Sequence, residues 1–208
     1  MPGKSQMFNT GGNMQETQYW LPTYAALGMA LLACFVMLYS GKESVQAQSR
    51  KQLVAMQTNA FNDIRSFIAQ NGMETGIEAI LEESSITLRL SESLLFAAGT
   101  EQFLPSALNT LNLLKELFII QAQQTINIRG YTDDSPPPAG ARFRDNWELS
   151  ALRAAHILRH LLAQGIEPGR LTATGFGELE PLFPNTVQEN RAKNRRVEFV
   201  LERHLGKE

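Results

Sequence analysis

The chain has 208 residues, with 19 lysines and arginines against 21 aspartates and glutamates, which gives a formal net charge of −2. This length accommodates one globular domain and an additional segment. The charge argues against a nucleic-acid-binding protein, which is usually clearly basic. A single cysteine excludes an internal disulfide and a multi-cysteine metal site, and three histidines offer little for zinc chemistry. We expect no bound cofactor.

Charged residues are missing from one stretch near the N-terminus. Residues 21–40 (LPTYAALGMALLACFVMLYS) are uncharged and mostly apolar. As a helix they would be about 30 Å long, which is enough to cross the hydrocarbon core of a bilayer. Aromatic residues, which favour the membrane interface, lie near both ends: Trp20, Tyr24 and Tyr39. The pattern predicts a transmembrane helix at residues 20–40, preceded by a tail at residues 1–19.

Two kinds of export signal are alternatives to this uncleaved anchor. A cleaved signal peptide needs a short basic start, whereas residues 1–19 carry only Lys4 and Glu16. A lipoprotein signal finds support in Leu-Leu-Ala-Cys, which ends at Cys34 and resembles a lipobox. The residues that follow Cys34 are FVMLY, however, where a polar linker would be expected. The sequence therefore favours an uncleaved anchor.

A stalk follows the predicted span. Residues 41–52 are polar, and from Leu53 apolar residues recur at intervals of three and four as far as Ile68. This spacing predicts a helix that ends at Asn71–Gly72. We assign residues 41–76 to the stalk, whose helix packs either on the following domain or on its copy in a dimer.

The rest of the chain alternates predicted strands and helices. Strands are expected at residues 77–81, 86–90, 125–130, 171–175 and 195–202, and helices from Pro105 and at residues 147–164. The order β-β-α-β-α-β-β predicts an α+β domain with helices on one face of a sheet. This domain occupies residues 77–203, and a short tail at residues 204–208 follows.

An acid and a base stand out as candidate ligand-binding residues. Asp133 lies where a predicted strand enters a long loop, which is a common place for a ligand-binding group. Arg153 lies about two turns into the next predicted helix. A carboxylate and a guanidinium that face one pocket can hold a zwitterion, because the first binds an ammonium and the second binds a carboxylate.

Several motifs in order carry a resemblance to a known family. They are GYTDD at residues 130–134, NWELSALRA at residues 146–154, NRRVE at residues 194–198 and WLPTYA at residues 20–25. The first three resemble the OmpA-like peptidoglycan-binding domain. The long insertion between GYTDD and NWELS, together with WLPTYA, is similar to the MotB-type stator proteins of the flagellar motor.

The resemblance implies a ligand, a location and partners. The ligand is the diaminopimelate zwitterion of peptidoglycan, with Asp133 on its ammonium and Arg153 on its carboxylate. The remaining motif residues have shaping or supporting roles: Thr132, Asn146, Leu149, Arg195 and Arg196. The resemblance also implies a single-pass protein of the inner membrane with a periplasmic domain. Its implied partners are a second copy of the chain and a polytopic MotA-like subunit.

One position departs from the family. MotB-type proteins carry a membrane aspartate that couples ion flow to torque, and Ala26 occupies the corresponding position here. A methyl group binds neither a proton nor a cation, and residues 21–40 contain no carboxylate. The sequence therefore favours a wall anchor over an ion-driven transducer.

Other functions have weaker support. An ion-driven transducer of a stator-like system and a Pal-like outer-membrane lipoprotein are the alternatives. His156 and His160 are spaced to bind a metal on one helix face, but no intervening glutamate completes an HExxH motif. Ser150 has no base at a useful spacing, so we expect no enzyme.

Overall fold

The computed structural model describes residues 20–138 and 140–203. The tails predicted at residues 1–19 and 204–208 lie outside the described residues. The chain divides into two compact units, with the boundary between Leu53 and Val54.

The first described element is a long helix, α1 (Trp20–Gln70). The two helices predicted on either side of residues 41–52 are therefore one element, because that polar stretch contains no proline to end it. Pro22–Tyr39 is long and apolar enough to cross a membrane, and its side chains are exposed. Farther along, Ile64 and Ile68 are buried in the core of the second unit, so this end of α1 packs on the domain.

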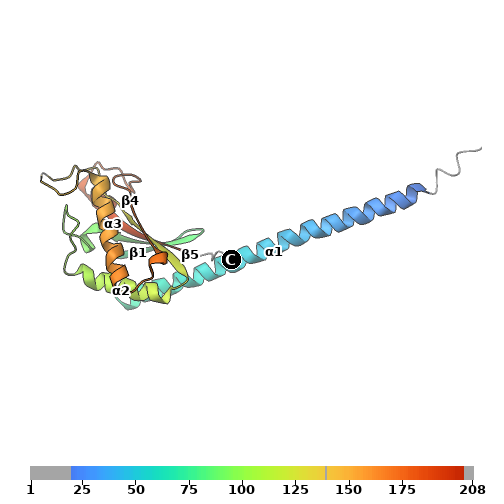
Figure 1. Ribbon diagram of the computed structural model, residues 1–208, viewed down its shortest axis with the longest axis horizontal. Helices are drawn as coiled ribbons and strands as arrows, with labels where there is room; N and C mark the ends of the chain where they lie inside the picture. Colours follow the sequence, from blue (N-terminus) through green and yellow to red (C-terminus); the bar gives the residue numbers. More distant parts are fainter. Residues whose placement is uncertain (1–19, 139, 204–208) are drawn as a thin grey trace, which may run out of the picture. The chain divides into compact units, whose positions relative to one another are not determined.

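The second unit is an α+β domain, and the predicted fold class is confirmed (Figure 1). Its strands are β1 (Ile77–Leu81), β2 (Ser85–Ser91), β3 (Gln124–Gly130), β4 (Leu171–Gly175) and β5 (Arg196–Arg203). Its helices are α2 (Ala107–Ile120), α3 (Asn146–Ala163) and α4 (Gln188–Asn194), with short 3₁₀ turns η2 (Glu92–Leu94) and η3 (Pro168–Arg170).

The short helix α4 was not expected from the sequence. Its residues, QENRAKN, include only one apolar side chain, so they show no helical periodicity. Because α4 runs to Asn194, strand β5 starts at Arg196 rather than at Arg195. Arg195 therefore lies at the junction between the helix and the strand.

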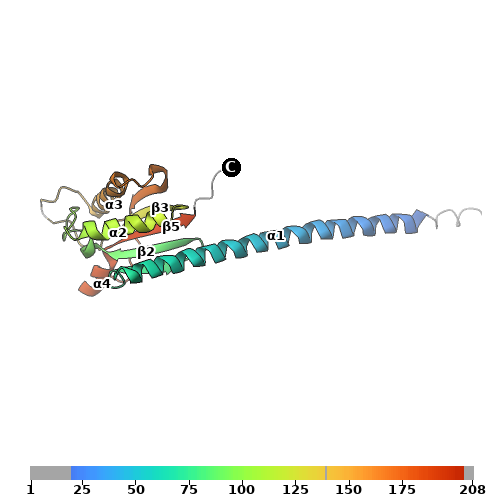
Figure 2. The same cartoon turned by 90° about the horizontal axis from the view of Figure 1, so that it is seen from below.

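The five strands form one sheet in the order β1-β2-β5-β3-β4. Strand β5 lies at the centre and pairs antiparallel with β2 and β3, while β3 and β4 run parallel. A parallel pair needs a crossover connection, which α3 provides. Figure 2 shows α2 and α3 on the same side of the sheet.

The hydrophobic core lies between these helices and one face of the sheet. Alternate residues of three strands face it: Ile86, Leu88 and Leu90 of β2, Ile126 and Ile128 of β3, and Val197, Phe199 and Leu201 of β5. The period of two follows from the pleat of a strand. The helices contribute Leu111, Leu114, Ile157 and Leu161. Each such side chain stabilises the fold by about 1.5–3 kcal/mol.

Two glycines let α3 approach the parallel strands closely. A Cβ atom on Gly130 would lie 2.4 Å from the backbone oxygen of Ser150, and one on Gly175 would lie 2.5 Å from the backbone nitrogen of Ala151. Both glycines end their strands, at the sheet edge where the loop to α3 begins. This contact fixes the start of α3 relative to the GYTDD loop.

Candidate ligand-binding site

Asp133 lies in the loop that follows β3, and its side chain is buried. The Oδ1 atom accepts a hydrogen bond from the backbone nitrogen of Ser135 at 3.0 Å. The Oδ2 atom accepts one from Nη1 of Arg195 at 2.5 Å. The carboxylate is therefore held by its own loop on one side and by a cation on the other.

The start of α3 holds the same loop in place. Asp145 caps the helix, since its carboxylate accepts a hydrogen bond from the backbone nitrogen of Glu148 at 2.8 Å. Asn146 donates from Nδ2 to the backbone oxygens of Asp133 at 3.2 Å and Ser135 at 3.0 Å. It also lies 3.1 Å from Oε2 of Glu178. Asn146 thus positions the backbone of Asp133.

Thr132 and Leu149 are both buried. The backbone nitrogen of Thr132 donates to the backbone oxygen of Gly177 at 2.7 Å. Its hydroxyl is buried and has no hydrogen-bond partner among the described residues. Leu149 lies in the first turn of α3, one turn before Arg153.

Arg153 is almost fully buried, with 2% of its surface exposed. Its Nη2 donates to Oε1 of Glu92 at 2.8 Å, and its Nε donates to the backbone oxygen of Thr100 at 2.8 Å. The guanidinium also lies 5.3 Å from the ring centroid of Phe96. Burial lowers the pKa of Arg153 from its ordinary value, although Glu92 opposes this shift.

Arg195 links Asp133 to Glu92, the carboxylate that is paired with Arg153. Besides its bond to Asp133, its Nε lies 3.7 Å from Oε2 of Glu92. The backbone nitrogen of Glu92 also donates to the backbone oxygen of Arg195 at 3.0 Å. Four charges therefore alternate in sign along one network, Asp133–Arg195–Glu92–Arg153, and their formal charges cancel.

Arg196 belongs to a different cluster, because neighbouring side chains of an extended chain point in opposite directions. Its Nε donates to Oε1 of Glu198 at 2.8 Å, and its guanidinium lies 3.6 Å from the ring centroid of Tyr131. Arg89 pairs with the same carboxylate oxygen at 3.0 Å. Burial and the charge of Glu198 raise the pKa of Tyr131 to about 12.

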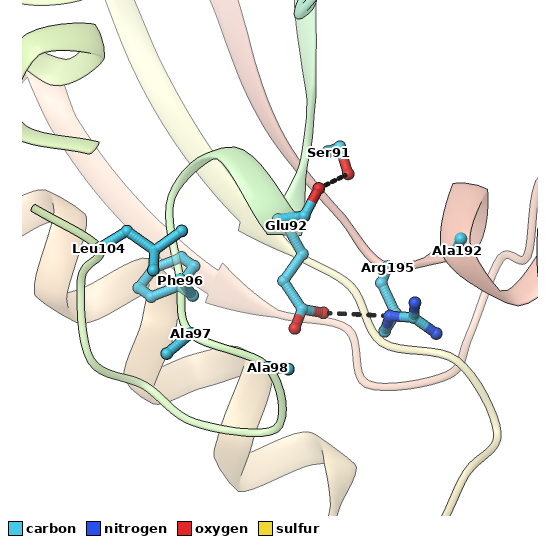
Figure 3. Close-up of a pocket in the computed structure, with 9 residues that line it drawn as sticks. Ser91, Glu92, Phe96, Ala97, Ala98, Leu104, Ala192 and Arg195 are labelled. Carbon is cyan, nitrogen blue, oxygen red and sulfur yellow. Dashed lines mark hydrogen bonds and ion pairs between the residues drawn. The ribbon is translucent and has the colours of Figure 1, made fainter. Parts of the chain in front are cut away.

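A cavity of about 270 Å³ opens beside the network. Its charged lining comes from Glu92 and Arg195, and Phe96, Ala97 and Leu104 contribute apolar wall (Figure 3). Glu92 was not among the residues singled out from the sequence. Glu92 directly follows β2, the strand that was predicted at residues 86–90, and this is the same signal that pointed to Asp133, namely a carboxylate at a strand end.

The two other positions considered from the sequence lie apart from the network. Ala26 lies within the exposed apolar part of α1. His156 is 2.9 Å from the backbone oxygen of Glu101 through Nδ1, and both His156 and His160 lie against Phe103. Within residues 20–138 and 140–203, no group of three or more histidine, cysteine or acidic side chains is arranged to hold a metal.

Known proteins resemble this chain in sequence and in structure. Residues 95–195 match the family model of the OmpA family. Motility protein B of Helicobacter pylori is 34% identical over 162 residues, which is 77% of this chain and 61% of that protein. The chain thus spans less than two thirds of that relative. The Peptidoglycan-binding protein ArfA of Mycobacterium bovis is 29% identical over 119 residues, 57% of this chain and 35% of that protein.

Two crystal structures share the fold. One is of a protein from Desulfovibrio vulgaris described as MotB-like; it is 54% identical, has a TM-score of 0.73, and is matched over 74% of this chain and 99% of that one. The periplasmic domain of Helicobacter pylori MotB is 28% identical, with a TM-score of 0.58 over 62% of this chain and 83% of that one. The chain therefore belongs to the OmpA family, as a MotB-like protein with an OmpA domain.

Proposed function

We propose that the domain binds peptidoglycan through the zwitterionic end of diaminopimelate, and that it anchors a membrane complex to the cell wall. The observation that carries this proposal is the four-charge network that joins Asp133 to Arg153. The four charges of this network sum to zero. A bound zwitterion is also neutral overall, so it adds no uncompensated charge to a buried site. The names of the relatives, a peptidoglycan-binding protein and motility proteins, point in the same direction.

In this proposal, Asp133 binds the ammonium of the ligand and Arg153 its carboxylate. Asn146 holds the loop of Asp133, and Thr132 and Leu149 shape the surroundings. Arg195 contacts Asp133 directly, so it supports the site before a ligand binds. Arg196 supports the site from outside, since it fastens the backbone next to Arg195 through Glu180 and Asn194.

We further propose that α1 anchors the chain in the inner membrane. Pro22–Tyr39 would span the bilayer, residues 1–19 would be cytoplasmic, and the OmpA domain would lie in the periplasm. A stator-type assembly would contain a second copy of this chain and a polytopic MotA-like subunit. The two relatives described above are named as a motility protein and a peptidoglycan-binding protein, which favours a role in attachment.

The apolar helix supports anchoring rather than ion transport. Ala26 provides no group that binds a proton, and Pro22–Tyr39 contains no carboxylate. Reconstitution of this chain with a MotA-like subunit should therefore give no ion flux above that of the subunit alone. Flux that depends on Pro22–Tyr39 would contradict this part of the proposal.

Cosedimentation with purified peptidoglycan tests the binding function. Replacing Asp133 by Asn removes the charge that should bind the ammonium, and we expect affinity to fall by about tenfold or more. Asp134→Asn is the matched control, because Asp134 is adjacent, equally charged and exposed. Equal binding by both variants would refute the assignment of Asp133.

A separate measurement addresses the lipoprotein alternative. Cys34 lies inside the continuous helix α1, where lipid attachment would require cleavage of the helix. Mass spectrometry of the mature chain should find no lipid on Cys34 and no new N-terminus at that residue. A lipidated Cys34 would show that the chain is anchored as a lipoprotein.

A further inference from the structure

The two carboxylate oxygens of Glu92 differ in their hydrogen bonding. Oε1 accepts the hydrogen bond from Arg153, whereas Oε2 is buried and has no hydrogen-bond partner among the described residues. A buried carboxylate oxygen without a donor is costly, so native structures rarely retain one without a reason. The residue lines the cavity beside the network, and Figure 3 shows its carboxylate directed toward Arg195.

Arg195 places a cation near this oxygen, and that cation is shared with Asp133. The guanidinium of Arg195 reaches Asp133 with Nη1 at 2.5 Å, and its Nε lies 3.7 Å from Oε2 of Glu92, which is beyond hydrogen-bond distance. A positive group thus occupies the space between two carboxylates and satisfies only one of them. Arg195 is also the most exposed member of the network, with 30% of its side chain accessible.

We propose that Glu92 is a binding residue for the ammonium of diaminopimelate: Glu92 and Asp133 hold that ammonium between their carboxylates, at the position of the Arg195 guanidinium. This proposal rests on the peptidoglycan function proposed above and adds a residue to its site. A tetrahedral ammonium has three donors and can serve both carboxylates, which the planar guanidinium does not do here. Arg195 gives up this position most easily, because its side chain already reaches solvent.

The rest of the cavity suits the rest of the ligand. Phe96, Ala97 and Leu104 provide apolar wall for the methylene chain of diaminopimelate. Oε1 of Glu92 stays on Arg153, so the guanidinium that is to bind the ligand carboxylate keeps its orientation. One glutamate therefore connects the two halves of the zwitterion site.

Two probes separate an ammonium-binding role of Glu92 from a purely supporting one. meso-Diaminopimelate carries amines and carboxylates, and pimelate has the same seven-carbon diacid chain without amines. Affinities for both are measured by calorimetry on the full chain in detergent. Glu92→Gln retains an amide oxygen for Arg153, and Glu83→Gln is the control because Glu83 is exposed.

We expect Glu92→Gln to weaken diaminopimelate binding by about tenfold or more and to leave pimelate binding unchanged or stronger. If Glu92 only supports Arg153, both ligands should weaken by the same factor, and that result would overturn the proposal, as would unchanged affinity for diaminopimelate. Should Glu92→Gln prove unfolded by circular dichroism, Glu92→Asp keeps the charge but shortens the side chain. The same selective loss is expected for it.

A third variant tests the position assigned to the ammonium. Arg195→Met removes the positive charge from the space between the two carboxylates, and it should retain the preference for diaminopimelate over pimelate. Loss of that preference would assign recognition of the ligand to Arg195 and overturn the proposed arrangement. If the unsubstituted chain bound neither diaminopimelate nor peptidoglycan, the proposed function itself would fail, which differs from a failure confined to Glu92.

Discussion

Arg153 and Glu92 form a buried ion pair at 2.8 Å between residues that are 61 positions apart in the chain. Both side chains are more than 90% inaccessible to solvent. The residue proposed to bind a ligand carboxylate is therefore already bound to a carboxylate of its own fold. Substitutions of Arg153 affect stability as well as binding, and the two effects must be measured separately.

Removal of one partner of this pair should destabilise the domain strongly. Arg153→Met leaves the carboxylate of Glu92 buried without its main counter-charge, and we expect a loss of about 3–5 kcal/mol in the free energy of unfolding. The double variant Arg153→Met with Glu92→Gln should recover much of this loss, because no buried charge remains unpaired. Urea unfolding monitored by circular dichroism provides the comparison. Additive effects of the two substitutions would contradict the coupling.

The close approach of α3 predicts that Gly130 tolerates no side chain. A Cβ at this position would lie 2.4 Å from the backbone oxygen of Ser150, and backbone cannot move aside as a flexible side chain can. Gly130→Ala should therefore cost about 1–3 kcal/mol or more. Gly169→Ala is the control, since the nearest atom to its Cβ would be a side-chain oxygen of Glu167 at 3.9 Å. Thermal unfolding midpoints that fall equally in both would argue against the close contact.

Asn194 fastens the loop between β4 and α4. Its side chain is fully buried, donating to the backbone oxygen of Phe183 at 2.7 Å and accepting from the backbone nitrogen of Phe183 at 3.0 Å. Asn194→Ala leaves both groups unpaired and should cost about 1–3 kcal/mol. Asn190→Ala removes an exposed hydrogen bond to Pro184 and should cost less. Hydrogen exchange should show faster exchange at Phe183 only in the first variant.

Acid should destabilise the domain partly through Glu198. Burial alone would raise the pKa of Glu198, but hydrogen bonds and charge from Arg196 and Arg89 outweigh it and lower the pKa below its ordinary value of 4.5. A carboxyl group with a lowered pKa in the folded state stabilises the fold above its unfolded-state pKa. That contribution is lost as the pH falls through the folded-state pKa.

The pH dependence can be assigned by substitution. The free energy of unfolding should fall between pH 6 and pH 3, and Glu198→Gln should make this fall shallower, at the cost of lower stability at pH 6. Glu202→Gln is the control, because Glu202 is exposed on the same strand. An unchanged slope in Glu198→Gln would show that other carboxyl groups cause the acid sensitivity.

Local patterns in the sequence determined most of the architecture. Alternating apolar residues predicted β2, and the spacing of apolar residues predicted α2 and the domain end of α1, because each of these elements buries one face against the core. The element that the sequence did not reveal, α4, buries almost no apolar surface. The position of α4 is determined by tertiary contacts, namely the hydrogen bonds of Asn194 to the preceding loop and the pairing of β5 in the sheet.

The sequence by itself determined which residues carry charge at the strand end and on the helix, namely Asp133 and Arg153, and that residues 21–40 are apolar. Only the tertiary structure decided which charges meet. Glu92 and Arg195 come from distant parts of the chain, and no local periodicity relates them to Asp133 or Arg153. Sheet pairing brings the end of β2 beside the start of β5, where the backbone of Glu92 bonds to that of Arg195. The ion pairs of the buried site follow from this strand pairing. A charge that is removed from water is stabilised by groups that lie close to it in space, and these need not be close to it in the sequence.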